Sequence, residues 1–213
     1  MEKMDFNFIK EFWNDEFYRY SSEELEKYSL NTETKSFLLK VGLLKFNYGL
    51  MKFMGTFEVK DYNNKKFIKI GKTYAGDLCL NEMQNKVFYF FLGQENIFEN
   101  SYCNSSIFEY IIFETLKRKI TKMYEKVEDD ALESYMCARE IIKLFKEIND
   151  LSIYPYSYWA NLMLEYAIGY FYDEDDMFEK AIENKKYKNF EEAYFDASFN
   201  GIEVLENKIG RFE

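Results

Sequence analysis

One stretch of the sequence, residues 76–106, constrains the fold more than any other. It contains two short apolar segments, Leu78–Leu80 and Val87–Leu92, joined by a polar connector. Segments rich in β-branched and aromatic residues, with a connector of hairpin length, predict two antiparallel strands. Residues 97–100 predict a third strand, and Asn104–Ser106 offers side chains that can cap a following helix. The stretch therefore predicts a meander that leads directly into a helix.

Upstream of this stretch, the sequence predicts helices first and strands second. Apolar spacing predicts a helix over residues 5–14. The caps and acids of residues 21–25 predict a short second helix, and Asn31 or Thr32 can cap a third whose apolar stripe runs from Phe37 to Val41. Gly42 stands where a left-handed C-terminal cap is favourable. Alternating segments then predict strands at residues 51–54, 55–60 and 66–71, with a turn at 61–64. Together with the meander, these segments predict an antiparallel sheet of about five or six strands.

Helical periodicity returns after residue 106 and continues downstream. Pro155 is the one proline of the 213 residues and marks the clearest joint in this region. We therefore predict an α+β domain over residues 1–150, with N-terminal helices, the sheet, and C-terminal helices. Residues 151–213 are predicted to form a helical extension packed on that domain.

The predicted aromatic strand has two different faces. Alternation places Phe88 and Phe90 on one face and Val87, Tyr89 and Phe91 on the other. Helices can cover one of the faces. The other face is either covered as well or partly exposed, in which case its rings can dock a partner.

The residue types disfavour most catalytic chemistry. There is no histidine, which removes Ser–His and Cys–His pairs and most zinc sites. The three cysteines form no CxxC motif and are expected to be free thiols in a reducing cytoplasm. The acidic runs Glu128–Asp130 and Asp173–Asp176 lack the EF-hand spacing and are expected to be solvated helix starts. We predict no metal, no cofactor and no enzymatic activity; a carboxylate-pair enzyme remains the competing hypothesis.

The charge balance bears on the choice of partner. The formal net charge is −10, which disfavours nucleic acid and favours a basic protein partner, unless the acidity only maintains solubility. No apolar run approaches the ~20 residues of a membrane span. The first ten residues contain acids and no apolar core, so we expect no signal peptide and a cytoplasmic location. The oligomeric state stays open.

The order of these motifs resembles the SUKH superfamily of bacterial immunity proteins. In that family an apolar strand, a turn, an aromatic strand and an Asn-Ser-Ser motif lead into a helix with Phe in its first turn. The corresponding residues here are Leu78–Asn81, Val87–Tyr89 and Asn104–Phe108. Upstream, Thr32–Leu43 is similar to the family's T-x-x-FL-x-x-x-GLP pattern. This chain departs from the family at Asn81, at Leu44 and in the inserted Tyr102–Cys103.

The resemblance covers roughly residues 5–150 and implies a binding protein. Such proteins neutralise a cognate bacterial toxin, often a nuclease or a deaminase. A scaffold or regulatory adaptor inside the cell is the alternative that the superfamily offers. For an immunity protein, we expect an acidic face to cover a basic toxin surface. The acids that we predict to contact the partner are Asp61, Glu82, Glu95 and Glu99 at the meander loops, and then Asp173, Glu174, Asp175 and Asp176.

Overall fold

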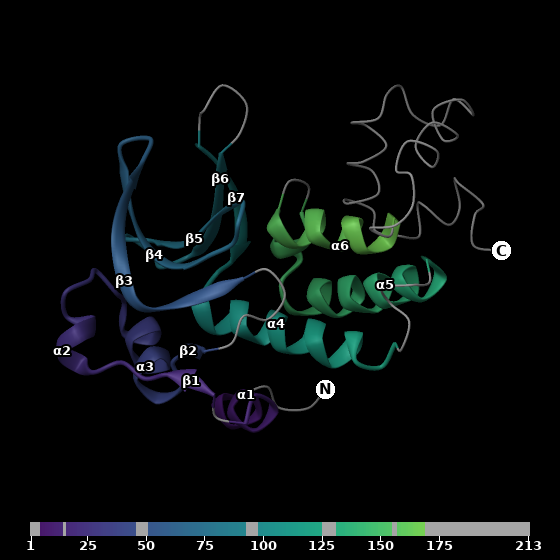
Figure 1. Ribbon diagram of the computed structural model, residues 1–213, viewed down its shortest axis with the longest axis horizontal. Coiled ribbons are helices and arrows are strands. Elements are labelled where there is room, and N and C mark those ends of the chain that lie inside the picture. The colour runs from purple at the N-terminus through teal and green to yellow at the C-terminus, as the bar shows by residue number, and fades with distance from the viewer. Residues whose placement is uncertain are drawn as a thin grey trace. The chain divides into compact units, whose positions relative to one another are not determined.

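The structure is a computed structural model that describes residues 5–14, 16–45, 51–92, 98–124, 131–154 and 157–168 (Figure 1). The chain divides into two compact units, Met1–Thr115 and Leu116–Glu213. Helices precede and follow an antiparallel sheet, so the predicted α+β class is confirmed. No described helix has both the length and the apolar character that crossing a membrane requires.

The first unit begins with three short helices whose starts follow from local capping. They are α1 (Phe6–Phe12), α2 (Ser22–Leu25) and α3 (Thr32–Lys40). The side chains of Asp5, Ser21 and Asn31 accept backbone N–H groups at the respective N-termini. These caps agree with the predicted helix starts, because an N-cap depends on residues that are close in sequence.

Two very short strands link the helices, and the sequence did not predict them. β1 (Phe17–Tyr18) pairs antiparallel with β2 (Leu43–Leu44). Two residues are too few to show an alternating pattern. Gly42, just before β2, has a φ of +92°, and a Cβ at this position would lie 1.8 Å from the Tyr18 carbonyl oxygen. The predicted left-handed glycine is confirmed, and the close approach of β1 is a second reason for it.

The main sheet is a meander in the order β3-β4-β5-β6-β7. Its strands are β3 (Lys52–Tyr62), β4 (Lys65–Lys72), β5 (Gly76–Asn81), β6 (Val87–Leu92) and β7 (Phe98–Asn104). The predicted segments 51–54 and 55–60 lie in one strand, with an irregular register between Phe53 and Glu58. Asn63 and Asn64 have φ angles of 53° and 63°, which close β3 and β4 with a tight two-residue turn.

The first face of the sheet belongs to the core of this unit. Its central residues, Ile68, Leu78 and Leu80, are fully buried. Phe53 of β3 makes an edge-to-face contact with Tyr110, in the first half of α4 (Ile107–Thr121). Three rings, those of Phe6, Phe37 and Phe108, contact one another and join α1, α3 and α4. Aromatic packing therefore connects elements that are distant in sequence.

The second unit is helical where the structure describes it. It contains the end of α4, α5 (Ala131–Ile148), a 3₁₀ turn η2 (Asp150–Ile153) and α6 (Tyr158–Ile168). The Trp159 ring is fully buried and contacts Phe145 edge-to-face, and the Lys117 ammonium lies 5.5 Å from its centroid. We predicted a domain boundary at 150/151. α5 packs against η2 and α6. The predicted division stays a prediction, and most of the predicted extension, residues 169–213, lies outside the described part of the chain.

Candidate partner-binding site

The second face of the sheet carries an aromatic cluster of its own. Tyr62, Phe67 and Phe90 pack together with Cys79, and Phe88 lies against them. The Tyr62 and Phe90 rings are stacked with centroids 4.2 Å apart, and Phe67 meets Phe90 edge-to-face at 4.6 Å. All four members of the cluster are buried. Most of the ring surface that the sequence left as a possible docking face is therefore buried.

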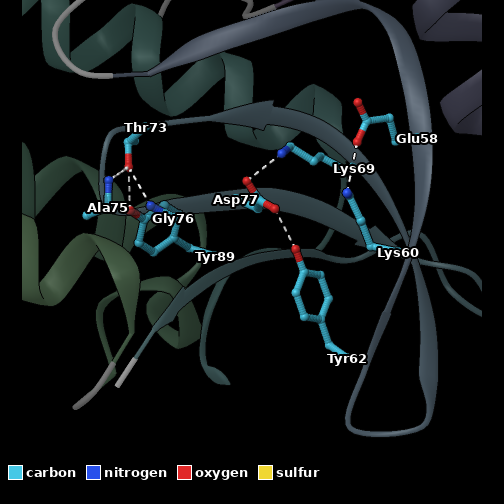
Figure 2. Close-up of polar contacts among 9 residues, drawn as sticks. All are labelled: Glu58, Lys60, Tyr62, Lys69, Thr73, Ala75, Gly76, Asp77 and Tyr89. Atoms are coloured by element: carbon cyan, nitrogen blue, oxygen red, sulfur yellow. Dashed lines mark hydrogen bonds and ion pairs between the residues drawn. The ribbon is translucent and has the colours of Figure 1, made fainter. Parts of the chain in front are cut away.

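A polar network joins this cluster through Tyr62, and Figure 2 shows the side chains of the network. The Lys69 Nζ lies 2.7 Å from Asp77 Oδ1, and the Tyr62 hydroxyl donates a 2.5 Å hydrogen bond to Asp77 Oδ2. The Lys69 and Asp77 side chains are only 12% and 22% exposed. Burial, and next the hydrogen bond to Asp77, raises the pKa of Tyr62 well above its usual value, so the hydroxyl remains a donor. Both carboxylate oxygens are engaged, and the network holds β3, β4 and β5 together.

The three thiols are poor nucleophiles. Cys79, Cys103 and Cys137 are free and buried. Burial raises the pKa of Cys79 to about 12 and that of Cys137 to about 11, and it raises the pKa of Cys103 well above its usual value. These thiols are protonated at neutral pH, whereas nucleophilic attack requires the thiolate. Their environment is that of small core residues.

The turn between β4 and β5 is closed by a threonine. Thr73 Oγ1 accepts the backbone N–H groups of Ala75 and Gly76 and shares a 2.5 Å hydrogen bond with the Tyr89 hydroxyl (Figure 2). The Tyr89 ring lies over Gly76, where an added Cβ would come within 2.7 Å of it. Tyr74 at the tip of this turn is 85% exposed.

The turn between β5 and β6 is fixed by asparagines. Asn85 is 1% exposed, with a φ of 54°. Its Oδ1 accepts the Asn31 backbone N–H at 2.6 Å, and its Nδ2 donates to the carbonyl oxygens of Ser29 and Asn81 at 3.1 Å. Asn81 Oδ1 in turn accepts the Lys86 backbone N–H at 2.7 Å. The turn is therefore held internally and is also joined to the segment that connects α2 to α3.

This fixed turn presents an apolar tip beside acidic residues. Met83 is 92% exposed and follows the half-buried Glu82. The neighbouring α2–α3 segment, residues 22–40, holds four exposed glutamates and three lysines, Lys27, Lys35 and Lys40, so it carries a small excess of negative charge. We call the turn residues 82–84 and these glutamates the Met83 edge; the glutamates are Glu23, Glu24, Glu26 and Glu33.

The predicted partner-binding acids do not form one cluster. Asp61 and Glu82 lie toward the same end of the sheet, since Asp61 pairs with Lys66 and Asn81 pairs with Phe67. Glu99 lies toward the opposite end, where it pairs with Phe91. Asp61 is exposed but stands between Lys60 and Lys66 in the hairpin, so its charge is locally offset. The acids at residues 95 and 173–176 fall outside the described part of the chain.

Sequence reasoning missed two residues of this turn: Asn85, which fixes its backbone, and Met83, which forms its exposed apolar tip. Asn85 lies in a polar connector, and its left-handed φ is a conformation that asparagine tolerates well. That preference was a usable signal, but the contact with Asn31 spans 54 positions and has no local signature. Met83 shows no pattern in the sequence that distinguishes an exposed methionine from a buried one.

Two further observations complete the description of the site. Within the ranges that the structure describes, no group of three or more acidic or cysteine side chains is arranged to hold a metal ion. Comparison of the chain with protein-family models, with curated proteins and with solved structures gives no match in any of the three.

Proposed function

We propose that this chain is an immunity-type binding protein that neutralises a cognate protein toxin by covering its nucleic-acid-binding surface. Two observations support the proposal. The order of helices, antiparallel meander and helices is the one that the resemblance to the SUKH superfamily implies. The Met83 edge then supplies a surface suited to a protein partner, and this is the observation on which the proposal depends most.

The rigidity of the turn is the first property that suits it to binding. A loop that must become ordered on association loses conformational entropy, which reduces the affinity. Here the Asn85 and Asn81 hydrogen bonds already order the backbone. Most of the backbone part of the ordering penalty is therefore absent, and the exposed side chains of the Met83 edge remain to be fixed.

The chemistry of the tip is the second property. Methionine adapts its shape to irregular apolar pockets. Burying a side chain of this size contributes about 1.5–3 kcal/mol. Glu82 lies next to Met83, and the α2–α3 segment, with its small excess of glutamate over lysine, is joined to the turn at Asn31; this negative charge accelerates encounter with a basic surface. A nuclease or a deaminase that holds nucleic acid presents such a surface, because the phosphate backbone selects for Lys and Arg.

Co-expression tests the proposal. The reading frame beside this gene is expressed in a host cell with and without the chain, and growth is measured. We expect the neighbour to be toxic and the chain to restore growth. Met83→Asp should abolish protection, whereas Tyr74→Asp, a matched change at an exposed tip toward the other end of the sheet, should retain it. The proposal would be contradicted if the neighbouring gene product is toxic and the chain does not restore growth. It would also be contradicted if the neighbouring product is not toxic and the chain binds a housekeeping protein, as the adaptor alternative predicts.

A further inference from the structure

Lysines line the second face of the β3–β4 hairpin. The strand register places Lys52, Lys72 and Asp77 in one cross-strand row and Glu58, Lys69 and Cys79 in the next. Paired residues of an antiparallel sheet point to the same side, and Asp77 contacts the aromatic cluster of the second face. Alternation along the strands adds two more lysines to this side. We call the resulting set the lysine stripe; its members are Lys52, Lys60, Lys65, Lys69 and Lys72.

Among the described residues, most of the positive charge of the stripe has no acidic counterpart. Glu58 and Asp77 are the acids on the same side of the hairpin and its neighbour β5, and each is already paired, with Lys60 at 3.1 Å and with Lys69 at 2.7 Å (Figure 2). Lys52, Lys65 and Lys72 are exposed, and none of the described acids lies within ion-pair distance of them. A chain of net charge −10 thus carries a cationic surface on its sheet.

We propose that the lysine stripe docks an acidic, extended segment of a partner protein. Lys65 and Lys72 are seven positions apart in β4, or about 23 Å at roughly 3.3 Å per residue. A strand-like segment of about seven residues has this length and can place carboxylates against both ends of the stripe. The network of Tyr62, Lys69 and Asp77 between these ends keeps the hairpin in place against β5.

Charge and ring burial favour an acidic protein segment over nucleic acid. Proteins that bind single strands stack bases on accessible aromatic rings, but the Tyr62, Phe67 and Phe90 rings of this face are 5%, 8% and 1% exposed. Residues 52–72 contain no arginine, the side chain that recognises phosphate in a bidentate manner. Lysine suits carboxylates spread along a flexible segment, because it acts as a mobile point charge.

The test uses the full chain and two fluorescent probes. One is a peptide of alternating Glu and Ser with five glutamates, and the other is a twelve-residue oligothymidylate. Fluorescence anisotropy is measured at low and at physiological ionic strength with two double variants of equal charge change. K52E/K72E alters the stripe, and K27E/K45E alters exposed lysines outside it. The melting temperatures of both variants are measured as well, to establish that each is folded.

We expect the peptide to bind saturably and in a salt-dependent manner. K52E/K72E should weaken it about ten-fold, the combined effect of reversing two exposed charges, and K27E/K45E should change it less than about two-fold. Absence of saturable peptide binding at low salt would overturn the inference. So would equal losses in the two variants, or tighter binding of the oligonucleotide than of the peptide. None of these readouts involves a toxin, so the result is independent of the function proposed above.

Discussion

Replacing Asp77 by Asn tests the polar network of the second face. The change keeps the shape of the side chain and removes its charge. It breaks the 2.7 Å ion pair with Lys69 and weakens the 2.5 Å hydrogen bond that Tyr62 donates. The Glu58–Lys60 pair of the same sheet offers a matched control, since its side chains are 49% and 42% exposed, against 22% and 12% for Asp77 and Lys69.

The two pairs should differ clearly in their effect on the free energy of unfolding. A hydrogen bond to a charged group contributes about 1.5–3 kcal/mol, and breaking a fully buried ion pair costs about 3–5 kcal/mol. Because Lys69 and Asp77 retain some exposure, we expect Asp77→Asn to cost about 2–3 kcal/mol. Glu58→Gln should cost less than about 0.5 kcal/mol, since exposed ion pairs contribute little.

Urea denaturation, followed by both circular dichroism and tryptophan fluorescence, measures these free energies. A double-mutant cycle of Tyr62→Phe with Asp77→Asn isolates the hydroxyl–carboxylate interaction, for which we expect a coupling energy of about 1–2 kcal/mol. The reasoning is refuted if Asp77→Asn costs no more than Glu58→Gln, or if the cycle shows no coupling.

Three further predictions concern backbone, turn and thiols. Gly42→Ala should lower the free energy of unfolding by about 3 kcal/mol or more, because φ is +92° and a Cβ would lie 1.8 Å from a carbonyl oxygen. Gly55→Ala, the control, should lower it by less than about 1 kcal/mol, and thermal denaturation compares the two variants. Asn85→Ala should lower the free energy of unfolding by about 2–4 kcal/mol and increase the hydrogen-exchange rates of backbone amides in the β5–β6 turn. Unchanged exchange rates would contradict the prediction. Aromatic disulfide reagents at pH 8 should modify the three buried thiols only after urea is added, and immediate labelling would refute their burial. Burial raises the pKa of Cys79 from 9.0 to about 12, so the contribution of the protonated thiol to the free energy of unfolding is intact below pH 9 and is lost as the pH rises toward 12. A free energy of unfolding that stays constant over this alkaline range would contradict the prediction.

Local signals in the sequence account for much of the fold. The caps at Ser21 and Asn31 and the left-handed Gly42 depend on neighbours within a few positions, so they were predictable. The strands of the meander were predictable for the same reason, because alternation and turn residues are local. The unit boundary at 115/116 was not, since it depends on how α5 packs against later elements.

The candidate site was less accessible to sequence reasoning. Successive turns of an antiparallel meander alternate between two ends of the sheet, so acids that are close in sequence, such as Glu82 and Glu99, were separated. The lysine stripe emerged from the register alone, because a shift of one residue would send these side chains to the other face. The acids of the α2–α3 segment became candidates for the site because the Asn31–Asn85 contact joins that segment to the turn.

The most direct test of the account is the affinity of the purified chain for the proposed toxin partner, measured by titration calorimetry with variants at the two exposed tips. Loss of about 1.5–3 kcal/mol of apolar burial predicts that Met83→Ala weakens binding about 10- to 100-fold. Tyr74→Ala, at the tip of the β4–β5 turn, should change the affinity less than about two-fold, because this turn lies outside the proposed interface. Equal affinities for wild type and Met83→Ala, or a larger loss from Tyr74→Ala, would contradict the proposed role of the Met83 edge.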